Sequence, residues 1–360
     1  RGREDGLRQE PAPLRDRQAL VSGVSGSSMG ILYYGAYRDD TVSQGAKCQT
    51  GACQSMESSL DEIASALVGT DHLRRVLSWP ARPDRGAALE NSWSSRLPSG
   101  GDYSMRAWSE RARAFALRES GASPFPAYLF NTTVVETGQP AAFVTTQFPS
   151  RAYREKFSEK LKQSAVVESI NRLFDLSTPQ QPESASDVGL QLATAARMSA
   201  TFPYVSPAAA LKIAGSKPYH LVDGGYYDNY GLAPVTQWLD DALEQMKPES
   251  RPEKLDIPVV IVQGLMQSSD DVLEGDKKLK KAKEIVVENH GWAWQLLAPP
   301  LTFLRTRTFG QWAGGIQSLQ LLKEKWALRN VTIRPVPLDY PAGKLAAACR
   351  AAPLSWNLDQ

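Results

Sequence analysis

Residues 20–37, with the sequence LVSGVSGSSMGILYYGAY, contain two overlapping serine motifs. Residues 23–27 have the form G-x-S-G-S, and residues 26–30 have the form G-x-S-x-G. A serine hydroxyl attacks a carbonyl carbon only when a base takes its proton, and a sharp turn with small neighbours presents such a serine to its substrate. The stretch therefore offers two candidate nucleophiles for acyl transfer, Ser25 and Ser28.

Ser25 fits a nucleophile turn better than Ser28 does. Such a turn strains the backbone of the nucleophile, and its neighbours must be small so that a strand and a helix approach closely. Gly23 and Gly26 meet this requirement around Ser25. Ser28 lies next to the bulky Met29, and a turn there would place both glycines within the strand. We expect Ser25 to be the nucleophile.

The elements around these serines alternate between strands and helices. ALVSGV is typical of a short buried strand and SSMGILYYGAY of an apolar helix, so the serines lie at a strand-to-helix turn. Residues 124–149 predict two strands joined by a hairpin. Helices are expected within 56–68, 105–119, 153–176, 188–203 and 233–246. A strand that ends in a glycine turn is expected at 219–223, and a buried strand at 257–266. This alternation predicts an α/β fold with a mostly parallel sheet.

The chain begins with a half-charged segment, residues 1–18, which two prolines interrupt. This composition is typical of a linker or the remnant of an upstream segment. We expect a single domain over residues 19–360.

Four segments together resemble the patatin-like phospholipase family, in particular its bacterial members. They are SGVSGSSMG, PAYLFNTTVVETGQPAAF, LATAARMSATFPYVSP and LVDGGYYDNYGL, in this order along the chain, and the terminal PLSWNLD is similar to the end of some bacterial members. The resemblance implies a three-layer α/β/α fold with a mostly parallel central sheet. It also implies a lipid acyl hydrolase of the phospholipase A or lysophospholipase type, acting on a phospholipid or another acyl-ester lipid through a Ser-Asp dyad and an acyl-enzyme.

The same resemblance makes Asp223 the base of the dyad, in direct contact with the serine. Asp223 ends an apolar strand sequence and precedes Gly224 and Gly225, which allow a turn and leave room for a substrate. Alone, this glycine-rich segment would be an ordinary turn. Beside the serine turn, we favour a catalytic role. Asp228 and Asn229 are expected to hold the loop through bonds from side chain to backbone.

A histidine base is the alternative to the dyad. His290 follows Asp223 in the chain, as in the Ser-Asp-His order of α/β-hydrolases. A surface or helix-terminal histidine is the simpler interpretation of His290. His72 lies in a charged stretch and His220 only three residues before Asp223, so neither is well placed.

The family's glycine-rich loop, whose N–H groups form the oxyanion hole, has no counterpart in residues 1–24. Each such donor contributes about 10²–10³-fold to the rate. We expect the natural protein either to supply the donors upstream or to use a shortened substitute loop, for which Gly100 and Gly101 are the weaker candidate. A chain without donors would be a weakly active or inactive lipid-binding protein on the same fold.

The composition excludes several other classes of protein. A net charge of +2 provides no overall field to attract nucleic acid. Three cysteines are too few for a disulfide framework. No apolar run reaches the ~18 residues of a membrane span. The serine stretch lacks the lysine of a P-loop and no H-E-x-x-H occurs, so we expect no cofactor and no metal.

A basic stretch at residues 276–309 has five lysines between residues 277 and 283, followed by Trp292, Trp294 and Phe303. Basic and aromatic side chains together suit peripheral contact with an anionic lipid surface. A solvated lysine helix whose tryptophans fill the core is the alternative. Cytoplasmic and peripheral-membrane locations both remain open.

Overall fold

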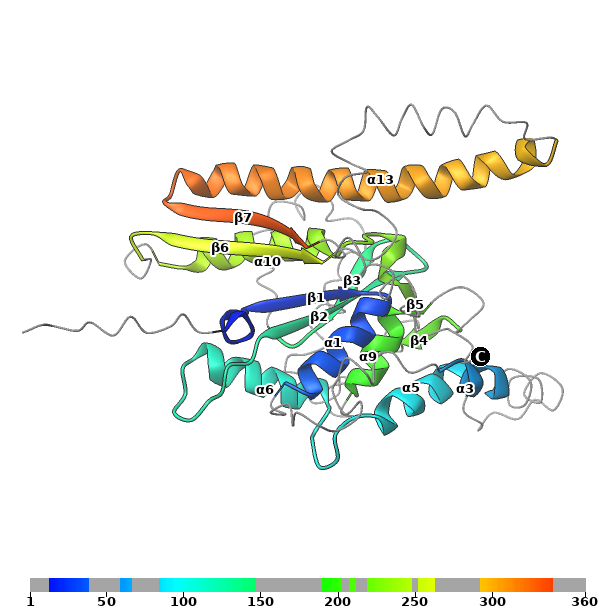
Figure 1. Cartoon of the computed structure of the whole chain (residues 1–360), viewed down its shortest axis with the longest axis horizontal. Coiled ribbons are helices and arrows are strands. Elements are labelled where there is room, and N and C mark those ends of the chain that lie inside the picture. The colour runs from blue at the N-terminus through cyan, green and yellow to red at the C-terminus, as the bar shows by residue number, and fades with distance from the viewer. Residues whose placement is uncertain are drawn as a thin grey trace, which may run out of the picture.

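The computed structural model describes residues 13–38, 59–66, 84–146, 190–201, 207–211, 219–247, 252–262 and 292–338. Figure 1 shows a central sheet with helices α1, α5, α6 and α9 on one side, and α10, a second sheet and the long helix α13 on the other. Helices and strands are both well represented, as the α/β prediction requires.

The main sheet is mixed and centres on β2. Its strands are β1 (Leu20–Val24), β2 (Ala127–Val134), β3 (Pro140–Val144), β4 (Ala209–Leu211) and β5 (Tyr219–Asp223). β1 runs parallel to β2, whereas β3 and β5 run antiparallel to β2, and β4 runs antiparallel to β5. Every residue of β2 is buried, as expected for a strand covered on both faces.

One face of this sheet carries the larger core. It packs against α1 (Gly26–Ala36), α5 (Arg85–Ser95), α6 (Met105–Ala116) and α9 (Leu192–Ser199), with α3 (Leu60–Ala66) beyond α5. Trp108 and Phe125 surround the ring of Tyr128 from β2, at centroid distances of 4.6 and 5.4 Å. The partly buried ion pair of Arg197 with Glu90 joins α9 to α5.

The opposite side of the molecule has a second core. Here α10 (Leu232–Gln245) and α13 (Trp292–Ala327) pack against the parallel strands β6 (Leu255–Val262) and β7 (Val331–Leu338). Leu319, Leu322 and Trp326 recur on one stripe of α13 and are fully or nearly fully buried. None of the described helices is long and apolar enough to cross a membrane.

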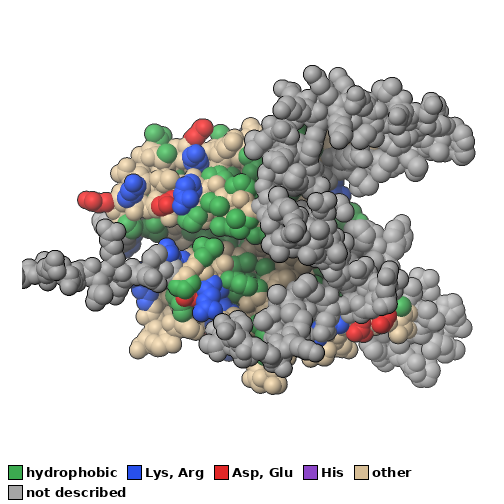
Figure 2. All heavy atoms as spheres, viewed as in Figure 1, with side chains coloured by type: hydrophobic (Ala, Val, Ile, Leu, Met, Phe, Trp, Pro, Cys, Tyr) green, Lys and Arg blue, Asp and Glu red, His purple; other side chains and the backbone are tan. Residues whose placement is uncertain are grey.

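The hairpin predicted at 124–149 is confirmed as β2 and β3, and the predicted helices that lie within described residues are confirmed as α1, α3, α6, α9 and α10. The prediction that the strand at 257–266 is buried was wrong, because β6 alternates between buried and exposed residues. Val262 is 77% exposed, and Figure 2 shows hydrophobic side chains over β6 and β7 among charged ones. The helix predicted at 153–176 lies outside the described residues.

The start of the described chain contacts the domain. Residues Leu14–Arg17 form a short 3-10 helix. Arg38, which is 8% exposed, donates to the carbonyl of Arg15 and to the side chain of Gln18. These residues of the predicted linker are therefore attached to the end of α1.

An added methyl group is expected to change the free energy of unfolding in opposite directions at Gly35 and Gly30, which both lie in α1. A Cβ at Gly35 would lie 2.2 Å from the ring of Trp108, which is 1% exposed, whereas a Cβ at Gly30 meets no atom within 4 Å. We expect Gly35→Ala to lower the free energy of unfolding by about 3 kcal/mol through overpacking. Gly30→Ala should raise it by about 0.5 kcal/mol through reduced backbone entropy. Urea unfolding of the two variants measures both effects, and equal effects would contradict the packing described.

Candidate active site

Ser25 occupies a strained turn between β1 and α1. Its backbone angles are φ 55° and ψ −129°, in a region that side-chain-bearing residues rarely adopt. Ser25 is the N-cap of α1, yet its hydroxyl makes no capping hydrogen bond. The hydroxyl is therefore held at the helix N-terminus, partly exposed and not used in the cap.

The two glycines beside Ser25 differ in what they permit. A Cβ at Gly23 would lie 2.9 Å from Ile31 and 3.0 Å from the Cα of Ser28, so Gly23 allows β1 and α1 to approach closely. A Cβ at Gly26 would meet no atom within 4 Å. The prediction that the neighbours of Ser25 must be small is therefore confirmed at Gly23 and was wrong for Gly26.

Ser28 has a structural environment rather than a catalytic one. Its side chain is fully buried, and its Oγ lies 2.6 Å from the Oγ of Ser199 in α9. The hydroxyl of Ser27 donates to the carbonyl of Val24 at 2.6 Å and accepts from the amide of the same residue at 2.7 Å. Of the three serines in the turn, only Ser25 presents a hydroxyl that is not engaged in these bonds.

The central strand brings Ser25 and Asp223 together. In the parallel ladder Val24, the last residue of β1, pairs with Asn131 of β2. In the antiparallel ladder Asp223, the last residue of β5, pairs with Thr132. Because β1 and β5 approach adjacent positions of β2 from opposite directions, their C-terminal ends meet. Ser25 follows Val24 directly and so lies beside Asp223.

The end of α9 holds the C-terminal ends of β1 and β5 in place. The carbonyl of Ser199 accepts the amide of Ser25 at 3.3 Å, and the carbonyl of Thr201 accepts the amide of Asp223 at 3.1 Å. The hydroxyl of Ser199 also donates to the carbonyl of Asn131. The third motif of the resemblance, LATAARMSATFPYVSP, thus fixes the backbone on both sides of the site.

Asp223 has the surroundings of a base. Its side chain is buried, with Oδ1 accepting the amide of Gly225 at 2.7 Å, while Oδ2 has no hydrogen-bond partner among the described residues. Burial raises the pKa of Asp223 above its ordinary value. Three groups partly offset this increase in the pKa of Asp223: the Ser25 hydroxyl, the Gly225 amide and the charge of Arg307.

The glycines after Asp223 provide close packing. A Cβ at Gly224 would lie 2.4 Å from the carbonyl oxygen of Asn131, and one at Gly225 would lie 2.7 Å from Oδ1 of Asn229. The expectation that Gly224 leaves room for a substrate was wrong, because the backbone of β2 fills that space.

The remaining polar residues of these motifs support the backbone. Asp228 accepts the amides of Tyr230 and Ala233 at 3.0 and 2.8 Å, as predicted. The amide nitrogen of the Asn131 side chain donates to the carbonyl of Gly23 and to the hydroxyl of Ser22, both at 2.8 Å. Asn131 therefore has a structural role, because it holds the C-terminal half of β1.

The predicted substitute oxyanion loop lies at the wrong end of α1. Gly100 and Gly101 line a hollow together with Ala36, the last residue of that helix. An 11-residue helix is about 15 Å long, so this hollow is remote from Ser25. The amides of Gly26 and Ser27 in the first turn of α1 have no intrahelical acceptor and lie beside Ser25.

No described histidine can complete a triad with Ser25 and Asp223. Nδ1 of His220 lies 2.6 Å from Oε1 of Glu136, at an exposed position. His220 also lies about 10 Å from Asp223 along β5. His72 and His290 lie outside the described residues, as do the three cysteines and the lysines at 277–283. The described part of the chain has no cluster of three or more residues able to hold a metal ion.

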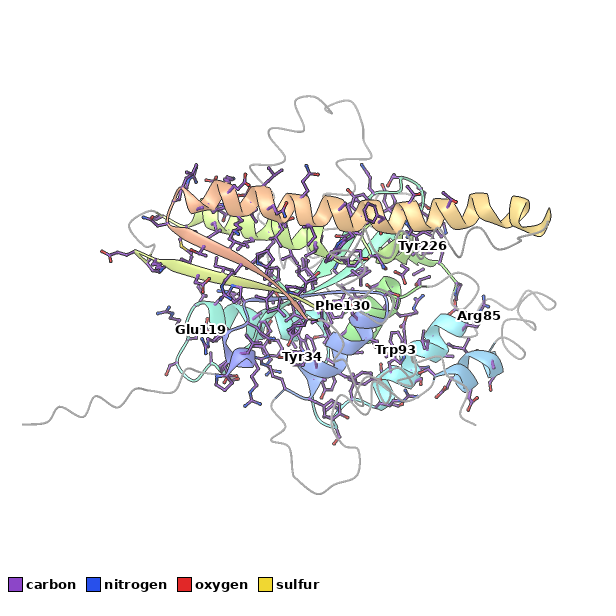
Figure 3. The ribbon with its side chains drawn as sticks, turned by 45° about the horizontal axis from the view of Figure 1, so that its top comes forward. Tyr34, Arg85, Trp93, Glu119, Phe130 and Tyr226 are labelled. Carbon is purple, nitrogen blue, oxygen red and sulfur yellow. The ribbon has the colours of Figure 1, made fainter. Side chains whose placement is uncertain are left out.

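Two residues of α13 contact the turn after Asp223, and the sequence motifs did not indicate them. Arg307 donates to the carbonyl of Gly225, and Gln311 donates to that of Tyr226 at 3.2 Å. Figure 3 shows Tyr226 beneath α13. Because 82 residues separate Arg307 from Gly225, no local pattern could have revealed this contact.

No protein-family model, curated protein or solved structure matches the chain. Membership of the patatin-like family therefore rests on the four sequence motifs and remains a proposal.

The strain at Ser25 predicts a gain in stability when it is relieved. Glycine adopts a positive φ without penalty, so Ser25→Gly should raise the free energy of unfolding by about 1 kcal/mol. Ser25→Ala retains a Cβ and should give no such gain. Urea unfolding of the two variants distinguishes these cases, and equal stabilities would argue against a strained nucleophile turn.

Proposed function

We propose that the protein is a serine acyl hydrolase of the patatin-like type, with a three-layer α/β/α fold, that cleaves fatty-acyl esters of lipids. The observation that supports this most strongly is the meeting of β1 and β5 on adjacent positions of β2. It places a strained serine with an uncapped hydroxyl beside a buried carboxylate whose pKa is raised. A raised pKa makes a carboxylate a stronger base.

In the proposed mechanism the ionised Asp223 takes the proton of the Ser25 hydroxyl while Oγ attacks the ester carbonyl carbon. The tetrahedral intermediate collapses to an acyl-enzyme, and Asp223 returns the proton to the departing alcohol. Asp223 then takes a proton from water, whose oxygen attacks the acyl carbon. Fatty acid leaves as the proton returns to Ser25.

The oxyanion of this mechanism would form at the N-terminus of α1. The amide of the residue after the nucleophile, Gly26, is a usual donor, and the helix dipole favours negative charge there.

Accumulation of an acyl-enzyme tests the proposed function. A short-chain aryl ester should release a burst of aryl alcohol equal to the amount of enzyme, followed by slower turnover. Acid quenching should leave the acyl group on the peptide that contains Ser25, detectable by mass. Absence of both burst and turnover in the full chain would favour a lipid-binding protein without catalysis.

A further inference from the structure

Helix α13 docks on the turn that follows Asp223 through one stripe of residues. Arg307, Gln311, Trp312 and Gly315 lie at spacings of four, five and eight, which puts them on one helical face. Trp312 packs against Tyr230 with ring centroids 4.7 Å apart and ring planes tilted by 53°. A Cβ at Gly315 would lie 3.1 Å from Leu232, the first residue of α10.

The polar contacts of this stripe are to the backbone of the turn itself. Gln311 donates to the carbonyls of Gly225 and Tyr226 at 3.4 and 3.2 Å, and accepts the amide of Asn229 at 3.2 Å. Arg307 donates to the carbonyl of Gly225, whose amide in turn binds the Asp223 carboxylate. The position of that carboxylate is thereby connected to α13 through one glycine.

Arg307 also acts on Asp223 through its charge. Its guanidinium lies 5.0 Å from the centroid of the Tyr226 ring, which holds the cation over the turn. The groups that act on the Asp223 carboxylate are the Ser25 hydroxyl from the β1–α1 turn, the Gly225 amide from its own turn and the charge of Arg307 from α13. β2 and the end of α9 face it with the uncharged Thr132 and Thr201. Among described residues, Arg307 is the cation that acts on Asp223.

We propose that Arg307 is a positioning residue for the acyl-transfer reaction: together with Gln311 it holds the turn that carries Asp223, and its charge favours the ionised carboxylate that accepts the serine proton. This proposal rests on the proposed function. It assigns to α13, which lies outside the four motifs, a direct effect on the base.

The test separates charge from shape with three variants of the full chain. Arg307→Gln removes the charge, Arg307→Lys retains it without the planar fork, and Gln311→Ala removes only contacts to the backbone. Arg307→Ala is measured as a second neutral variant, and circular dichroism selects the variants that fold as the parent does. The titration of Asp223 is followed by NMR of ¹³C-labelled aspartate carboxyls, with its signal assigned by its absence in Asp223→Asn.

We expect the neutral variants at position 307 to raise the pKa of Asp223, because they remove a cation that favours the ionised carboxylate. Arg307→Lys and Gln311→Ala should titrate near the parent. The rate at which a fluorophosphonate modifies Ser25 should show the same displacement in its pH profile. An Asp223 titration that coincides in the parent and the neutral variants would overturn the proposal.

The NMR titration does not depend on turnover. A parent chain that hydrolyses no ester would refute the proposed function, while the displacement of the Asp223 titration would still decide whether Arg307 acts on this carboxylate.

Discussion

Ser25→Ala is expected to lower the turnover of a short-chain aryl ester by about 10⁵-fold or more, because no other group can form the acyl-enzyme. Ser28→Ala is the matched control, since Ser28 lies three residues further along the chain, within α1, and is fully buried against Ser199. This control should keep turnover within a few-fold and lose about 1–2 kcal/mol of stability, because a buried hydroxyl partner is removed.

Steady-state kinetics and urea unfolding of the two serine variants measure these effects. A large loss of turnover in Ser28→Ala without one in Ser25→Ala would reverse the assignment of the nucleophile. A loss in neither variant would mean that the hydrolysis takes place elsewhere.

Asp223→Asn is expected to lower kcat by about 10⁴-fold, because the amide cannot accept the serine proton. Asp241→Asn is a matched control. Asp241 is another carboxyl with a buried oxygen that has no described partner, and burial with the nearby Asp240 and Glu244 raises its pKa to about 6. It belongs to α10 near Lys325 of α13, away from Ser25, so this variant should keep kcat.

The stability of the same two variants, relative to the parent, is expected to depend on pH. A raised carboxyl pKa means that the folded state binds the proton more tightly than the unfolded state. Ionisation therefore costs stability as the pH rises from the ordinary carboxyl pKa through the raised one. Asp223→Asn and Asp241→Asn should both be more stable than the parent at pH 8 and gain less at pH 4. Thermal unfolding at the two pH values measures this, and a larger gain at pH 4 would contradict the raised pKa values.

Local sequence patterns predicted the parts of the site that depend on local chemistry. The glycine at position 23, the strained serine and the strand that ends at Asp223 each follow from a few adjacent residues. The hairpin of β2 and β3 follows from alternating apolar residues around the turn at Gly138, which has φ 68°.

The parts that the sequence did not predict depend on contacts between distant segments. Asp223 pairs with Thr132 because β5 runs antiparallel to the C-terminal end of β2. No periodicity in the sequence indicates that β5 is the strand that pairs there. Helix α13 contains Gly310, Gly314 and Gly315, which weaken a helical signal, and its packing on α10 and β7 overrides that propensity. The contacts of Arg307 could not be predicted for the same reason.

Labelling with a fluorophosphonate, followed by mass mapping of the modified peptide, tests most directly whether Ser25 is a nucleophile activated by Asp223. We predict one adduct, on Ser25, formed rapidly in the parent, absent in Ser25→Ala and strongly slowed in Asp223→Asn. An adduct on Ser28, or labelling of Ser25 at the same rate in Asp223→Asn as in the parent, would contradict the dyad.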